Sequence, residues 1–194
     1  MPYELKHISL SNKLYDELVG ELRKSFPNAC VLYIKQVVNP ELQTKYEKFV
    51  GQNKVTEHRL FHGTKASVLG SICEFGYKKE YNVVSAYGIG TYFSGAGDVS
   101  KQYTDTTDEG QSFLFVNRVA VGADTGGCHP SIYAVRHDDA AYPEYLISFH
   151  MMARMSAKEE LDDDTTLRTF PLPLTRRRKT RRTVDMTAVG HNNI

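Results

Sequence analysis

The segment that decides the fold spans residues 112–149, SFLFVNRVAVGADTGGCHPSIYAVRHDDAAYPEYLISF. It holds three runs rich in β-branched and aromatic residues, at 112–121, 131–135 and 145–149, and this composition predicts strands. The helices that we expect lie mostly before this segment, so the chain lacks the strand–helix alternation of a doubly wound sheet. This order indicates an α+β domain with a mostly antiparallel sheet.

Upstream, apolar residues recur four positions apart, which predicts an amphipathic helix over residues 10–26. Residues 30–38, CVLYIKQVV, have the composition of a strand. Asn39-Pro40 then predicts the start of a second helix, because proline is well tolerated in a first helical turn. The shorter elements that we expect are a strand at 59–61 and helices at 65–74 and 98–103.

Length and composition indicate one globular domain with additional chain, since the 194 residues are 41% hydrophobic and 24% charged. The net charge of +1 favours neither nucleic acid nor membrane as a partner. No apolar run approaches the roughly 18–20 residues of a spanning helix, and residues 1–30 lack a signal-peptide pattern. Three widely spaced cysteines without a CxxC motif argue against a zinc site and favour a reducing compartment. We therefore expect an intracellular protein, nuclear or cytoplasmic, without a metal or a membrane contact.

The composition changes after residue 152, where an acidic cluster over 159–164 is followed by the basic run Arg176–Arg182. Opposite charge blocks with few apolar residues predict a disordered tail over 153–194, which leaves the folded domain at 1–152. The basic run has two interpretations. It is either a nuclear-localisation or nucleic-acid contact, or a solvated tail without aromatic residues to stack on bases.

Two motifs are candidates for chemistry. LFHGT at 60–64 places a histidine and a glycine at the end of a strand, where backbone can approach a ligand closely. YGIGTYFS at 87–94 combines turn-forming glycines with tyrosine rings that can stack on a planar group. It matches neither a GxGxxG nor a GxxxxGK[ST] phosphate loop. Taken alone, each motif favours the structural interpretation, a half-buried histidine before a turn and a packed aromatic loop.

Together and in order, the motifs HGT at 62–64, GTYFS at 90–94, PSIY at 130–133 and YPEYLI at 142–147 resemble the catalytic domain of the poly(ADP-ribose) polymerase family. They are most similar to its mono-ADP-ribosyltransferase branch. The resemblance runs from about Val31 to Phe149. It implies the ADP-ribosyltransferase fold, NAD⁺ as co-substrate, and transfer of one ADP-ribose to protein side chains with release of nicotinamide.

The resemblance implies an NAD⁺ pocket formed by His62, Gly63, Thr64, Tyr87, Tyr92, Phe93, Ser100 and Tyr103. In it, His62 would hydrogen-bond a ribose hydroxyl. The backbone of Gly63 and the hydroxyl of Ser100 would hold the nicotinamide carboxamide. Tyr92 and Tyr103 would flank the nicotinamide ring.

The resemblance also implies a catalytic set of His62, Tyr92 and Ile132. Polymer-forming members carry a glutamate at the third position, where the register counted back from Tyr145 places Ile132. Isoleucine can neither hydrogen-bond nor carry charge, so chain elongation is expected to be absent. Glu144, which is close by in sequence, is expected at the start of the next strand as a solvent-facing or structural carboxylate.

Two departures from the family pattern keep other functions open. The segment between Tyr77 and Tyr87 is short and carries Lys78 and Lys79 where family members often have an arginine. The connection from 121 to 132 is compact, although family members usually carry a longer acceptor-side loop here. One alternative is therefore a catalytically inactive module that binds NAD⁺ or ADP-ribose. A second is a nucleic-acid-binding protein that acts through the tail. No motif encodes the acceptor residue type or the oligomeric state.

Overall fold

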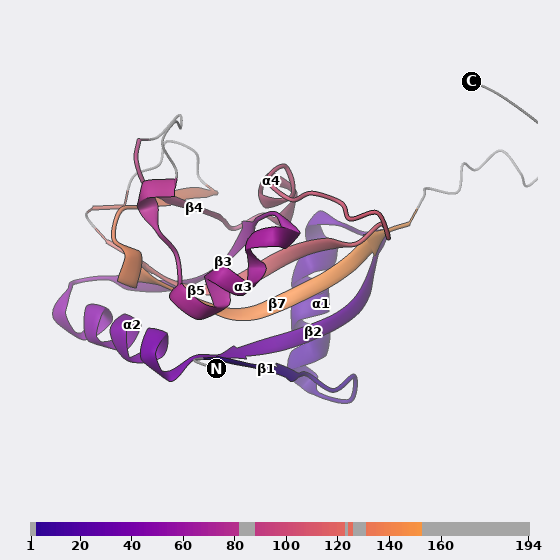
Figure 1. Cartoon of the computed structure of the whole chain (residues 1–194), viewed down its shortest axis with the longest axis horizontal. Coiled ribbons are helices and arrows are strands. Elements are labelled where there is room, and N and C mark those ends of the chain that lie inside the picture. The colour runs from indigo at the N-terminus through magenta and orange to yellow at the C-terminus, as the bar shows by residue number, and fades with distance from the viewer. Residues whose placement is uncertain (1–2, 82–87, 123, 126–130, 153–194) are drawn as a thin grey trace, which may run out of the picture. The chain divides into compact units, whose positions relative to one another are not determined.

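The computed structural model describes residues 3–81, 88–122, 124–125 and 131–152 (Figure 1). Tyr87 and the predicted tail at 153–194 lie outside these residues. The strands are β1 (Glu4–His7), β2 (Ala29–Val38), β3 (Thr56–Gly63), β4 (Thr91–Ser94), β5 (Ser112–Val121), β6 (Ile132–Val135) and β7 (Ala141–Met151). The α-helices are α1 (Lys13–Ser25), α2 (Pro40–Gln52), α3 (Leu69–Phe75) and α4 (Gly97–Lys101). Short 3-10 turns are η1 (Ala66–Val68), η2 (Lys79–Tyr81) and η3 (Asp138–Ala140).

The strands form one seven-stranded sheet in the order β1-β2-β7-β5-β3-β4-β6. Every neighbouring pair in this order is antiparallel. The expectation of an α+β fold with a mostly antiparallel sheet and flanking helices is confirmed.

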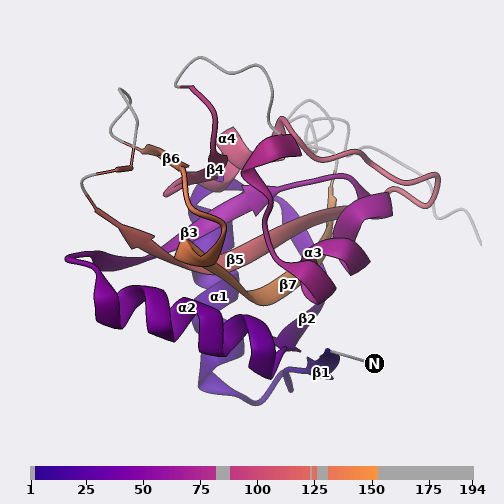
Figure 2. The ribbon, with the colours of Figure 1, turned by 60° about the vertical axis from the view of Figure 1, so that its left-hand side comes forward.

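Both faces of the sheet are covered, because alternate residues of its central strand β5 enter two different cores. Leu114 and Val116 pack with α1 on one face, while Phe113 and Phe115 belong to the core that contains residues of α2 and α3. Figures 1 and 2 show α1 behind the sheet and α3 in front of it. The longest described helices, α1 and α2, have 13 residues each, and no described helix is long and apolar enough to cross a membrane.

The first helix begins three residues later than predicted. The side chain of Asn12 accepts a hydrogen bond from the Leu14 N–H at 3.0 Å, which satisfies one free donor of the first turn. Leu18 and Leu22 of the predicted apolar stripe are fully buried, whereas Leu10 lies before the cap and is 73% exposed. A polar cap, and not the apolar spacing, therefore sets the start of α1.

The prediction that a helix begins at Asn39-Pro40 is confirmed. The Asn39 side chain also binds the C-terminal end of a second helix, α3. Its Oδ1 accepts from the Leu42 N–H at 3.2 Å, which caps α2. Its Nδ2 donates to the carbonyl oxygens of Cys73 and Glu74, at 2.9 and 3.1 Å, at the end of α3. Asn39 is 1% exposed, and both its amide oxygen and its amide nitrogen have hydrogen-bond partners. This buried side chain therefore joins α2 to α3.

Several strands differ from their predicted bounds. β5 spans the predicted residues 112–121, but β3 extends over eight residues because it pairs with β5 from Thr56↔Val121 to Gly63↔Leu114. β7 is longer than 145–149 for the same reason, since it lies between β2 and β5. The segment 91–94, expected within an aromatic loop, is strand β4, and β1 was not predicted. In each case, pairing with a strand distant in sequence supplies the hydrogen bonds.

Candidate active site

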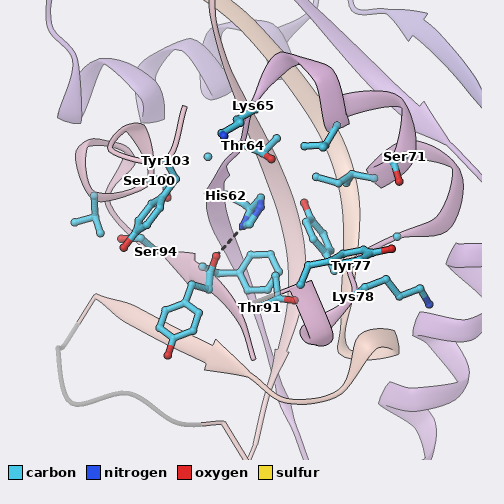
Figure 3. A pocket seen from close by; sticks show the side chains of 18 of the residues that line it. His62, Thr64, Lys65, Ser71, Tyr77, Lys78, Thr91, Ser94, Ser100 and Tyr103 are labelled. Carbon is cyan, nitrogen blue, oxygen red and sulfur yellow. Dashed lines mark hydrogen bonds between the residues drawn. The ribbon is translucent and has the colours of Figure 1, made fainter. Parts of the chain in front are cut away.

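A cavity of about 680 Å³ opens where β3 ends, between α3 and α4 (Figure 3). The predicted site residues that line it are His62, Gly63, Thr64, Tyr92, Phe93, Ser100, Tyr103 and Ile132. Tyr87, also predicted to contribute, lies outside the described residues. Residues separated by up to 70 positions are thus brought to one cavity by the pairing of β3 with β4 and of β4 with β6.

The imidazole of His62 is held by a backbone group of the neighbouring strand. Its Nδ1 lies 2.8 Å from the carbonyl oxygen of Tyr92, which is drawn as the dashed line in Figure 3. A carbonyl oxygen only accepts, so Nδ1 carries the hydrogen and Nε2 keeps its lone pair. Burial lowers the pKa of His62 below its ordinary value, although the Tyr92 carbonyl opposes this shift. The ring is therefore neutral at pH 7 and offers Nε2 as a hydrogen-bond acceptor.

Two aromatic rings pack around His62. The rings of Tyr77 and His62 pack edge to face, with 4.9 Å between centroids and 69° between planes, and the Phe93 ring centroid lies 5.5 Å from that of His62. Tyr77 and Phe93 pack edge to face at 5.0 Å. Tyr77 lines the cavity, but sequence reasoning used it only to mark a loop boundary. The sequence held one indication of a buried polar contact here. Asn117, which accepts the hydrogen bond of the Tyr77 hydroxyl, is the one amide side chain in the largely apolar run at 112–121.

Gly63 and Ser100 lie so close that only glycine fits at position 63. A Cβ placed there would lie 1.7 Å from the Ser100 carbonyl oxygen. The Ser100 hydroxyl is buried and donates to the carbonyl oxygen of Phe61 at 3.1 Å, so its oxygen retains lone pairs to accept from a ligand amide. The contact joins the end of β3 to α4 and forms one wall of the cavity.

Two tyrosines that were predicted to flank a planar ring have different surroundings. The Tyr92 hydroxyl donates to the Gly88 carbonyl oxygen at 2.7 Å. Tyr103 is 63% exposed, and its backbone N–H donates to the Ser100 carbonyl oxygen at 3.2 Å. Figure 3 shows Tyr103 and Ser100 on one side of His62, with Tyr77 and Lys78 on the other. A flat ligand bound between these two sides would contact the ring of Tyr103 on one side and the ring of Tyr77 on the other.

Ile132 lies on the strand next to Tyr92. It pairs with Ser94, two residues beyond Tyr92, so the three residues share one face of the β4–β6 pair. Ile132 lines the same cavity as His62. At this position the side chain is aliphatic and offers neither a proton acceptor nor a charge.

A family model described as the poly(ADP-ribose) polymerase catalytic domain matches residues 15–125. The chain belongs to this family. It is 27% identical over 176 residues to human (Homo sapiens) protein mono-ADP-ribosyltransferase PARP14, a match that covers 72% of this chain and 10% of that protein. It is 24% identical over 190 residues to Mus musculus protein mono-ADP-ribosyltransferase PARP12, covering 79% of this chain and 26% of that protein. Mus musculus protein mono-ADP-ribosyltransferase PARP10 is 25% identical over 153 residues, covering 61% and 16%. The chain thus spans between a tenth and about a quarter of these relatives.

The match to the poly(ADP-ribose) polymerase catalytic domain includes His62 and Tyr92 and ends before Ile132.

Within the matched region, two lysines also line the cavity. Lys65 is exposed, and Lys78 lies 3.5 Å from Asp138. Sequence reasoning noted Lys78 but not Lys65, which directly follows the HGT motif. Lys65 places positive charge beside a cavity that is otherwise mostly apolar and aromatic, whereas Asp138 balances the charge of Lys78.

Glu144 does not line the cavity of this family domain. It is the fourth residue of β7, not its first, and lies at the bulge where Val116 pairs with Tyr145 and Asn117 with Pro143. Burial raises the pKa of Glu144, against the opposing effect of Arg59 and Arg118. Within the described part of the chain, no three His, Cys, Asp or Glu side chains form a group that could hold a metal ion.

Proposed function

We propose that this domain transfers a single ADP-ribose from NAD⁺ to a protein side chain and releases nicotinamide. The observation that carries the proposal is the arrangement of the cavity. In it, His62 of β3 is hydrogen-bonded to the backbone carbonyl of Tyr92 of β4, and Gly63 and Ser100 are in close contact beside it. The family match and the names of the three relatives above, each a protein mono-ADP-ribosyltransferase, support this reaction class.

The residues of the cavity fit NAD⁺. The close contact of Gly63 with Ser100 places the Gly63 backbone and the Ser100 hydroxyl at one wall of the cavity, where a carboxamide would meet both. The Nε2 of neutral His62, which has no hydrogen bond to the described residues, suits a ribose hydroxyl, which would donate to it. Tyr92 and Tyr103 supply ring faces for nicotinamide. Lys65 would favour the negative pyrophosphate.

The reaction is a glycosyl transfer. The bond between C1′ of the ribose and the nicotinamide nitrogen breaks, nicotinamide leaves with the electron pair, and the ribose acquires oxocarbenium character. The acceptor nucleophile then forms the new bond at C1′, and an acceptor that carries a proton releases it. The role of the protein is to hold the ribose and the leaving group in reacting geometry, which contributes most where the contacts strengthen in the transition state.

Transfer of one unit is supported by Ile132. Elongation requires a group that draws the proton from a ribose hydroxyl of the growing chain, and isoleucine has none. An acceptor carboxylate would serve as its own nucleophile, because it is already ionised at pH 7, whereas a hydroxyl acceptor would lose its proton to water. The same feature favours the second candidate, a module that binds NAD⁺ or ADP-ribose without transfer.

The deciding experiment is incubation with NAD⁺ and candidate acceptor proteins, followed by intact mass and a nicotinamide assay. We expect mass increases of single ADP-ribose units that disappear in His62→Ala. His150→Ala is the matched control, because His150 also bonds through Nδ1 to a backbone carbonyl, that of Gly110 at 2.7 Å, but lies outside the cavity. A thermal shift with NAD⁺ and no transfer would establish the binding module instead.

A further inference from the structure

Asn117 is a buried amide in the centre of the sheet. It is 0% exposed and lies in β5, where its neighbours along the strand are apolar or, in the case of Arg118, partly exposed. Its Nδ2 donates to the carbonyl oxygens of Leu60 at 3.0 Å and Phe115 at 3.3 Å, and its Oδ1 accepts from the hydroxyl of Tyr77 at 2.5 Å. Burial of an amide is costly unless such partners are present. The amide is thus fully engaged, although it does not line the cavity.

Tyr77 connects this amide to the site. It follows Gly76, whose positive φ of 73° ends α3 and turns the chain toward the sheet. The ring of Tyr77 is 4% exposed, with its hydroxyl on Asn117 and its edge on His62. Burial raises the pKa of Tyr77 well above its ordinary value, so the hydroxyl remains protonated and donates.

His62 has one hydrogen bond to the described residues, through Nδ1 to Tyr92. A single bond defines the position of Nδ1 but leaves the ring free to tilt about it. The rings of Tyr77 and Phe93 prevent that tilt, because they contact the imidazole and also each other. Phe93 is held by packing alone, whereas Tyr77 is anchored by its hydroxyl.

We propose that Tyr77 and Asn117 are positioning residues, which act through the imidazole of His62 to keep its Nδ1–H on Tyr92 and its Nε2 directed to the bound ribose. The part that concerns the ribose rests on the proposed function, whereas the effect on the imidazole does not. Tyr77 also lines the cavity, so a variant that removes only its hydroxyl is needed to separate positioning from contact with substrate.

The test uses Tyr77→Phe, Asn117→Leu and the double variant. Tyr142→Phe is the matched control, because Tyr142 is 5% exposed and donates its hydroxyl to the Val37 carbonyl oxygen at 2.8 Å, away from the cavity. Three quantities are measured: the ¹⁵N chemical shifts of the His62 ring against pH, kcat and KM for NAD⁺, and Tm.

In Tyr77→Phe we expect the ring nitrogens of His62 to report a mixture of tautomers in place of the Nδ1–H form, with a shifted pKa. We expect kcat to fall about tenfold or more, with KM changed less, since misplacing a group by about 1 Å can cost a hundredfold in rate. Asn117→Leu is expected to do the same, and the double variant to lose less than the product of the two, because the pair acts as one unit.

Unchanged His62 nitrogen shifts in Tyr77→Phe would overturn the proposal, whatever happens to Tm. So would equal changes at His62 in Tyr142→Phe, because they would reveal a general loss of stability. If the wild-type protein has no transferase activity, the proposed function fails, while the nitrogen shifts still decide the positioning of His62.

Discussion

Replacement of Gly63 by alanine tests the geometry of the candidate site most directly. The added Cβ would lie 1.7 Å from the carbonyl oxygen and 2.6 Å from the carbonyl carbon of Ser100. Real Cβ contacts essentially never fall below 3.0 Å, so the end of β3 and α4 must separate by at least 3.0 − 1.7 = 1.3 Å. The obstacle is backbone, which cannot rotate away as a flexible side chain would.

That separation has two measurable consequences. Overpacking of this kind costs about 1–3 kcal/mol of stability. Displacement of the Ser100 carbonyl also disturbs its hydrogen bond from the Tyr103 N–H and the bond from the Ser100 hydroxyl to Phe61. Because a displacement of about 1 Å can reduce the rate a hundredfold, we expect kcat/KM for NAD⁺ to fall by about that factor or more.

The assay is nicotinamide release against NAD⁺ concentration, with Tm measured in parallel. Gly20→Ala is the matched control, since Gly20 lies inside α1 and a Cβ there meets nothing within 4 Å. Alanine is favoured over glycine in a helix by about 1 kcal/mol, so this control should raise Tm slightly and leave turnover unchanged. Wild-type turnover and Tm in Gly63→Ala would refute the close contact of β3 and α4 and the carboxamide site built on it.

Five further predictions concern the other residues of the site and the C-terminal tail. Because burial lowers the pKa of His62 below 6.5, activity should be retained at pH 6.5 and fall only at more acidic pH; a midpoint above 6.5 would contradict a neutral His62. Because the pKa of His62 is lower in the folded state, the unfolded state protonates His62 at a higher pH than the folded state does. The free energy of unfolding should therefore decrease as the pH falls from 6.5 through the lower folded pKa. In His62→Ala, Tm should decrease less over the same pH range. Tyr92→Ala should abolish binding of an NAD⁺ analogue, measured by calorimetry, because it removes a ring face from the cavity; unchanged affinity would argue against the pocket. Products should carry one ADP-ribose per site, since Ile132 has no group that activates a hydroxyl, and a ladder of polymer on a gel would contradict this role. Deletion of Arg176–Arg182, which lie outside the described residues, should remove any nuclear accumulation of a fluorescent fusion, and an unchanged distribution would leave these residues as a solvated tail.

The elements that could be predicted from sequence are those whose signal is local. The run at 112–121 is apolar on both faces because β5 lies in the middle of the sheet, and it was predicted with its observed bounds. Asn39-Pro40 marks the start of α2 through cap chemistry that involves only neighbouring residues. β1 and β4 have four residues each, and they exist through pairing with β2, β3 and β6, which are distant in sequence.

The sequence by itself, through the resemblance of its ordered motifs to the poly(ADP-ribose) polymerase family, predicted His62, Tyr92, Ser100 and Ile132 as site residues, and all four line one cavity. Only the tertiary structure decided how they are held. The tautomer of His62 depends on a carbonyl of another strand, the requirement for glycine at 63 depends on the backbone of α4, and the ring of Tyr77 is oriented by Asn117, 40 residues away. These are contacts between segments that have no periodic relation along the chain, so their distances are set by the packing and hydrogen bonds of the folded domain.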